Sequence, residues 1–277
     1  MIFMKNIFLF LATTLLWNTV VTAQTTRTLK KVSEFKMPKT AEDSMPGKNG
    51  ASIVWHTLQK KYYASMAGNS QFPLAVFNET GKRLSSENLT AMIDVRGLWF
   101  NPQKELLCGN GYNDNGWFHY ILDPKGTVND VEVDIAEMAQ PNAQCVGTYN
   151  SKSNEVMFLN GNQVSLYSNV GSANNKVNLR FGLAKKDDIG EMFEMSTLTP
   201  EDYNYTVVIY SGIKNAELGV LNIEKNQIEL YGFDEGFLNT VLKLPESQVT
   251  YSAFNFAYTN GMYWFFDKET RVWTSYK

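Results

Sequence analysis

The sequence predicts an all-β domain, and three features indicate it. Short runs of β-branched and aromatic residues alternate with turn residues about every eight to twelve positions. Aromatic residues make up 13% of the chain, and flat rings pair well across neighbouring strands. The 277 residues include 44% apolar residues, enough to bury a large core. Chains of this kind fold as sandwiches, barrels or propellers.

The first 23 residues are typical of a signal peptide. Lys5 supplies a positive charge, Ile7–Leu16 form an apolar run, and small residues end at Ala23. This pattern predicts cleavage near Ala23, which leaves Gln24 as the first residue of the mature chain. The apolar run is too short for a stable membrane-spanning helix. We therefore expect a secreted or periplasmic protein without a membrane span, with residues 24–277 as one domain.

The mature chain is divided into five clusters of strand-like segments, and the spacing of the clusters favours one architecture. The clusters begin near Ala51, Val95, Gln144, Glu191 and Tyr251, 44 to 60 residues apart. That is the size of one four-stranded propeller blade.

Internal echoes in the sequence support the same division. The segments "VFNETGKRL", "ILDPKGTVN" and "VLNIEKNQIEL" each join an apolar strand end, a polar turn and a new strand. They predict the hairpins between the third and fourth strands of blades one, two and four. The chain thus resembles β-propellers in general over Thr28–Lys277, without a motif that ties it to one branch. The alternative architecture is an aligned β-sandwich.

The two ends of the mature chain predict how the ring closes. The last cluster offers three strands, Tyr251–Tyr258, Met262–Phe266 and Arg271–Tyr276. One further strand, Thr28–Met37, precedes the first full cluster, and we expect it to lie beside the C-terminal strand and remove the open sheet edge. A rival register gives the last blade a first strand near Leu238–Leu244. A short helix over Asp234–Leu244 is a further alternative.

Charge and the rarer residue types exclude several classes of site. The net charge of -3 and the scattered Lys and Arg residues argue against nucleic acid as a partner. Cys108 and Cys145 are allowed to form a disulfide after export, but buried free thiols are expected in a large core. His56 and His119 lie inside strands with aromatic neighbours, where packing between sheets is the expected role. We expect neither a metal site nor a cofactor.

Carboxylates supply the candidates for catalysis. Glycoside hydrolases, which include some five-bladed propellers, use two carboxylates close together. The positions of Asp94, Glu191 and Glu194 near predicted innermost strands, and of Asp234 and Glu235 in a loop, make them candidates. Solvent-facing charges and turn caps are the simpler interpretation of the same residues.

The segment "GNGYNDNGWFHY" supplies the candidates for ligand binding, namely Tyr112, Asn113, Asp114, Asn115 and Trp117. No helix is predicted after its glycines, so it does not suit a phosphate. It also lacks the acids of a calcium loop. A polar hairpin tip explains it equally well. The same face is expected to carry other loops between second and third strands, at Asn69–Gln71, Asn160–Asn162 and Ile213–Asn215.

Three functions remain open. The first is an exported non-catalytic binding module that holds a protein or a glycan, because amides and rings suit sugar recognition. The second is a hydrolase or lyase that acts on polysaccharide. The third is a structural component of a cell-envelope assembly, which predicts a large apolar patch on the outer strands.

Overall fold

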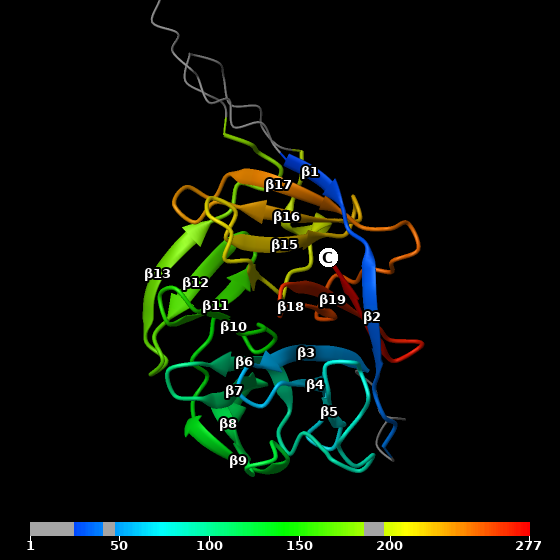
Figure 1. The fold of residues 1–277 in the computed structure, drawn as a ribbon. Coiled ribbons are helices and arrows are strands. Elements are labelled where there is room, and N and C mark those ends of the chain that lie inside the picture. Colours follow the sequence, from blue (N-terminus) through cyan, green and yellow to red (C-terminus); the bar gives the residue numbers. More distant parts are fainter. Residues whose placement is uncertain (1–24, 41–47, 186–196) are drawn as a thin grey trace, which may run out of the picture.

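The computed structural model describes residues 25–40, 48–185 and 197–277. Within them, twenty strands form five small sheets, and Figure 1 shows the sheets arranged as a ring around a central axis. The chain is a five-bladed β-propeller, as the sequence predicts. The predicted signal peptide lies outside the described residues. No helix in the described part of the chain is long and apolar enough to cross a membrane.

The first three blades follow one another along the chain. Blade 1 contains β3 (Asn49–His56), β4 (Lys61–Ala67) and β5 (Leu74–Phe77). Blade 2 contains β6 (Val95–Asn101), β7 (Leu106–Gly111), β8 (Trp117–Leu122) and β9 (Val128–Ile135). Blade 3 contains β10 (Thr148–Asn150), β11 (Glu155–Asn160), β12 (Gln163–Tyr167) and β13 (Ala173–Asn178). In blade 1, residues 83–91 run beside β5 in place of a regular fourth strand, with Leu84 donating to the carbonyl of Val76.

The last two blades each take a strand from the N-terminal segment. Blade 4 contains β14 (Ile209–Tyr210), β15 (Leu218–Asn222), β16 (Gln227–Tyr231) and β17 (Leu238–Lys243), and β1 (Thr25–Thr28) lies parallel to β17. Blade 5 contains β18 (Phe256–Thr259), β19 (Met262–Asp267), β20 (Val272–Tyr276) and β2 (Lys31–Lys36). The first strand of every blade lies nearest the axis, and consecutive strands within a blade are antiparallel.

The predicted closure by the N-terminal strand is confirmed. β2 pairs with β20, with Phe35 opposite Trp273. The buried ring of Phe35 also lies 5.0 Å from that of Tyr62 in blade 1 and 4.7 Å from that of Trp264 in blade 5. This strand therefore joins the last blade to the first. The rival register and the helix over Asp234–Leu244 are both wrong, because residues 238–243 form β17, whose backbone pairs with β16 on one side and β1 on the other.

Blade 4 differs from the prediction in where it begins. Its innermost strand is β14, and the predicted first strand near Glu191 falls outside the described residues. The hairpin "VLNIEKNQIEL" joins β15 to β16, so it links the second and third strands instead of the third and fourth.

Five hairpins, one in each blade, share a turn that the sequence analysis missed. A side chain at the start of the turn accepts a backbone N–H two or three residues later, as Asn and Asp commonly do. Four residues after the start, the backbone has a positive φ. The starting residues are His56, Asn101, Asn150, Asn222 and Asp267, and the positive-φ residues are Lys60, Glu105, Asn154, Asn226 and Arg271. The turn is a clear internal repeat.

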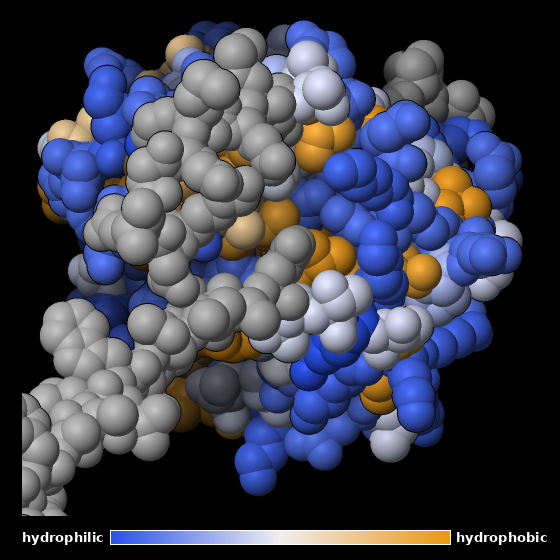
Figure 2. Space-filling view, turned by 90° about the horizontal axis from the view of Figure 1, so that it is seen from above, coloured by the Kyte–Doolittle hydropathy of each residue, from blue (hydrophilic) through white to orange (hydrophobic). Residues whose placement is uncertain are grey.

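The interfaces between blades are filled with apolar side chains. Cys108 and Cys145 are buried free thiols in the cluster between blades 2 and 3, as expected for a large core. Burial raises the pKa of each thiol to about 12. Figure 2 views the ring from the side on which β1 and β17 lie, and there the visible hydrophobic residues form separate groups among hydrophilic ones.

Candidate functional site

A pit of ≈ 390 Å³ opens at one end of the central axis. The innermost strands of blades 1, 2, 3 and 5 contribute to it, together with the turns that follow them, and blade 4 adds Val207, which lies just before β14. Because every blade adds at least one residue to its lining, it is the candidate binding site.

The floor of the pit is apolar and closely packed. It is made chiefly by the buried side chains of Ser52, Val54, Leu98, Val146, Val207 and Phe256. The Oγ of Ser52 donates to the carbonyl of Leu98, 3.5 Å away, so the one polar floor residue links blade 1 to blade 2.

The wall consists of half-buried aromatic rings. Trp55, Phe100 and Tyr149 come from blades 1, 2 and 3, and Tyr258 comes from blade 5. Burial raises the pKa of both tyrosines above its ordinary value, so both hydroxyls stay neutral at physiological pH. The wall thus offers ring faces and uncharged hydroxyl groups.

Polar groups around the mouth complete the site. Thr57, Ser151 and Asn260 are exposed at the ends of three innermost strands. Deeper in the pit, the hydroxyl of Thr148 donates to the carbonyl of Val208 (2.7 Å), and that of Thr259 accepts the N–H of Trp55 (2.9 Å). None of the lining residues, all of which belong to the described chain, is Asp, Glu, His, Lys, Arg or Cys. The pit is therefore neutral and has no carboxylate or imidazole for acid–base chemistry.

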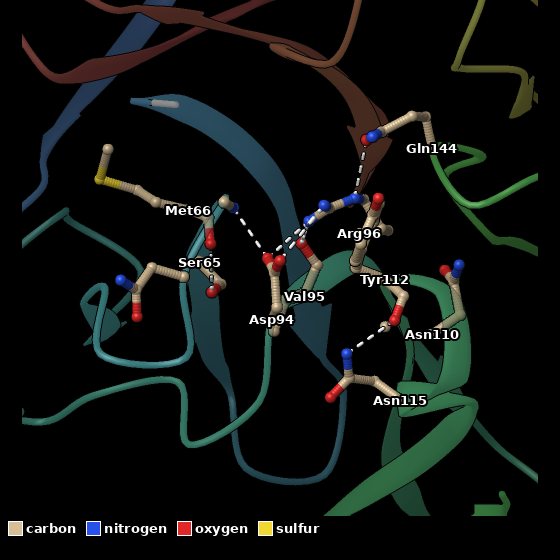
Figure 3. A network of polar contacts seen from close by, with 12 residues as sticks. Ser65, Met66, Asp94, Val95, Arg96, Asn110, Tyr112, Asn115 and Gln144 are labelled. Carbon is tan, nitrogen blue, oxygen red and sulfur yellow. Dashed lines mark hydrogen bonds and ion pairs between the residues drawn. The ribbon is translucent and has the colours of Figure 1, made fainter. Parts of the chain in front are cut away.

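The opposite end of the axis is closed by Arg96, at the start of β6 (Figure 3). Its buried guanidinium donates to both carboxylate oxygens of Asp94 (2.5 and 3.2 Å) and to Oε1 of Gln144 (3.0 Å). The group also lies over the rings of Tyr112 and Phe254, 4.6 and 5.5 Å from their centroids. Segments leading into β6, β10 and β18 thus meet around one buried side chain.

The structure separates the carboxylates proposed for catalysis. Asp94 lies where β6 starts and is bound by Arg96 and by the N–H of Gly68 (2.8 Å). Asp234 and Glu235 lie in the loop from β16 to β17, at the end of the sheet where the innermost strand finishes, and Glu235 forms an ion pair with Lys185. Glu191 and Glu194 fall outside the described residues. Asp94 and the Asp234–Glu235 loop are at opposite ends of the strands.

The segment proposed for ligand binding divides into a tip and a core residue. Tyr112 covers Arg96, and Asn113–Asn115 form a 3₁₀ turn in which the side-chain amide of Asn115 donates to the carbonyl of Tyr112 (2.6 Å). Asp114 is exposed in that turn. Trp117 is buried between blades 2 and 3, with its ring 5.6 Å from that of Trp99.

Two of the three loops expected on the same face as this tip lie where they were expected. Asn69–Gln71 and Asn160–Asn162 do lie between second and third strands. Ile213–Asn215 lies between β14 and β15, the first and second strands of blade 4, so its expected position is wrong. The error follows from the misplaced start of blade 4.

The two histidines have different surroundings. His56 is buried behind the pit wall, its ring 4.3 Å from that of Phe100, and burial lowers its pKa from 6.5 to about 4. His119 lies on the outer part of blade 2, with Nδ1 3.1 Å from Asp134 and Nε2 3.7 Å from Glu132. Among the residues described, no group of three or more His, Cys, Asp and Glu side chains is placed to hold a metal ion.

The sequence analysis missed one buried carboxylate, Glu229 in β16. Its oxygens accept hydrogen bonds from Tyr203 (2.7 Å), Tyr231 (2.5 Å), Asn222 (2.9 Å) and Gln227 (2.6 Å). Burial and the charge of Glu229 raise the pKa of both tyrosines. Glu229 lies inside blade 4, so we assign it a role in the packing of this blade. The alternation in "QIELY", which puts it on one face with Gln227 and Tyr231, was the available signal.

Comparisons with known proteins bear on the fold. No family model matches the chain, and no curated protein sequence matches it. The glutaminyl cyclase of Myxococcus xanthus has a similar structure, with a TM-score of 0.56 at 12% identity over 92% of this chain and 97% of the cyclase. Virginiamycin B lyase from Staphylococcus aureus (TM-score 0.42, 11% identity, 90% and 99% covered) and the Pan2 WD40 domain of Neurospora crassa (0.46, 10%, 90% and 95%) are more distant. At 12% identity the similarity to the cyclase bears on the fold alone, and the ligand of this chain must be argued from its own residues.

Proposed function

We propose that this protein is an exported, non-catalytic binding module that holds a neutral glycan in the central pit. The observation that carries the proposal is the lining of the pit, where aromatic rings alternate with hydroxyl and amide groups and no side chain is charged. The signal-peptide pattern of residues 1–23 supports export.

The chemistry of the pit fits a sugar better than a charged ligand. Ligand sites of about 300–1,000 Å³ are commonly apolar and aromatic with a few placed polar groups. The rings of Trp55 and Tyr258 offer flat apolar surfaces for the C–H face of a pyranose, and Asn260 and Ser151 offer partners for its hydroxyls. A carboxylate or phosphate buried there would find no charged partner, which is costly.

The same lining favours binding over catalysis. Hydrolysis of glycosides generally needs two carboxylates on either side of the scissile bond. The pit lining offers none, and the imidazole of His56 lies behind the wall.

A binding experiment with two variants tests the proposal. The mature chain is screened by thermal shift against neutral oligosaccharides (glucans, mannan and xylan fragments) and against uronic-acid oligosaccharides. A neutral ligand at 100 times its Kd stabilises the folded state by about 2.7 kcal/mol, which raises the Tm by about 5–10 °C at this chain length. We expect Tyr258→Ala to weaken binding at least about tenfold. The matched control Tyr205→Ala, at a tyrosine that is 51% exposed outside the pit, should leave it unchanged.

The outcomes of this experiment either support or contradict the proposed function. Absence of a shift with every neutral oligosaccharide, or equal binding by Tyr258→Ala and the wild type, would contradict the proposal. Each bound glycan is incubated with the protein and analysed by chromatography, and cleavage would show that the protein is an enzyme and not a binding module. A peptide that begins with glutamine is included because the glutaminyl cyclase shares this fold. A change in the mass of that peptide would also show that the protein is an enzyme.

A further inference from the structure

We infer that the pit takes the end of a glycan chain and does not bind the interior of a chain. The inference rests on the proposed function, and it follows from the shape of the pit instead of its lining.

The pit is blind. Its floor residues are all buried, and behind them the axis is occupied by Arg96 and Phe254, which are 4% and 7% exposed. Arg96 cannot swing aside at low cost, because its donors are held by Asp94 and Gln144 and its plane is covered by Tyr112. A ligand therefore enters and leaves through one mouth.

The pit is also small. Its 390 Å³ lies near the lower end of the range of about 300–1,000 Å³ that small-molecule sites occupy. The space thus suits a short piece of a glycan chain. An internal unit has a continuing chain on both sides, and both would have to pass through the same mouth. A terminal unit continues on one side only, so it fits without a sharp bend in the chain.

The polar groups at the mouth agree with this direction of entry. Thr57, Ser151 and Asn260 are exposed on three different blades around the opening. They are placed to contact the sugar unit that follows the buried terminal one, while the rings below contact the terminal unit itself.

Chain length provides the test. The parent polysaccharide of each neutral oligosaccharide in the panel is tested in competition binding to the mature chain, both as the intact polymer and after enzymatic shortening. For any glycan that binds, tenfold shorter chains should lower the mass concentration for half-saturation about tenfold, because chain ends per unit mass rise tenfold. Linear and cyclic α-1,4-glucans form a matched pair, since the cyclic form has the same units and no ends, and it should not bind.

The outcomes separate this inference from the proposed function. If half-saturation follows mass regardless of chain length while Tyr258→Ala still weakens binding, the pit is the site but the inference that it takes chain ends (the end rule) is overturned. If the cyclic glucan binds as well as the linear one, the end rule is overturned as well. If no glycan binds, the proposed function fails and the end rule falls with it. Selective capture by either the reducing or the non-reducing end supports it.

Discussion

Protonation of His56 makes the stability of the folded chain depend on pH, and the substitution His56→Asn should remove that dependence. Burial lowers its pKa to about 4 in the folded chain, whereas the ordinary value is 6.5. Between these values the unfolded chain binds the proton and the folded chain does not, so stability falls as the pH falls from about 6.5 to about 4 and His56 adds no further loss below that. The full shift is worth about 3 kcal/mol at 1.36 kcal/mol per unit, of which about 2 kcal/mol is lost between pH 7 and pH 4.5.

The repeated turn indicates the right replacement. Asn101, Asn150 and Asn222 start the same turn in other blades and accept the same kind of backbone N–H that His56 accepts from Gln59 (3.3 Å). His56→Asn should therefore keep the turn, although it loses the ring contact with Phe100 and so some stability at every pH.

Urea unfolding at pH 7 and pH 4.5 measures the effect. Other groups titrate in this range in both proteins, so the comparison between them isolates His56. We expect the wild type to lose about 2 kcal/mol more than His56→Asn over this interval, with unchanged m-values. Equal losses in the two proteins would refute the reasoning.

Two further pairs of substitutions test the packing of the ring. Phe35→Ala, which empties the contact between the first and last blades, should cost about 3–5 kcal/mol, whereas Val32→Ala on the exposed side of the same strand should stay within about 0.5 kcal/mol. Similar unfolding free energies for this pair would contradict the role given to β2. Gly97→Ala should lower the free energy of unfolding by at least about 1–3 kcal/mol, because the new methyl group would lie 2.5 Å from the backbone nitrogen of Gly147. Gly161→Ala, which meets nothing within 4 Å, should cost about 1 kcal/mol through its positive φ alone. Urea midpoints in the reverse order would show that the innermost strands can move apart.

The strand pattern was sufficient to predict the number of blades and their closure, because both depend on counting strands and on the need to cover an edge. It was not sufficient for blade 4. The strand β14 contributes only Ile209 and Tyr210 to its ladder, and apolar residues near Glu191 gave an equally good local signal. Local periodicity does not show which strand of a blade lies nearest the axis, since the first strand and the middle strands of a blade are similarly apolar and buried.

The candidate site was missed for a related reason. The polar composition of the tip at Tyr112 predicts ligand binding there, whereas nothing in the local sequence distinguishes Trp55 from a ring that packs between blades. Aligning the repeated turns would have changed this, since Trp55, Phe100 and Tyr149 each immediately precede the residue that starts the turn in blades 1, 2 and 3. In these three blades the repeat thus marks the pit wall, while the floor depends on contacts between blades that no single segment reveals.

The pairing of the N-terminal segment also sets the order in which the strands of blade 5 can assemble. β2 finds its partner β20 at the far end of the chain, so that Ser33 and Ser275, 242 residues apart, lie with their hydroxyl oxygens 2.7 Å from each other. The strand β2 must therefore wait until β20, 242 residues further along the chain, has been synthesised. Until then β2 has no edge of blade 5 to pair with. The ring can close only after both strands are present, so blade 5 is completed by a contact of very large sequence separation, the kind that forms slowly.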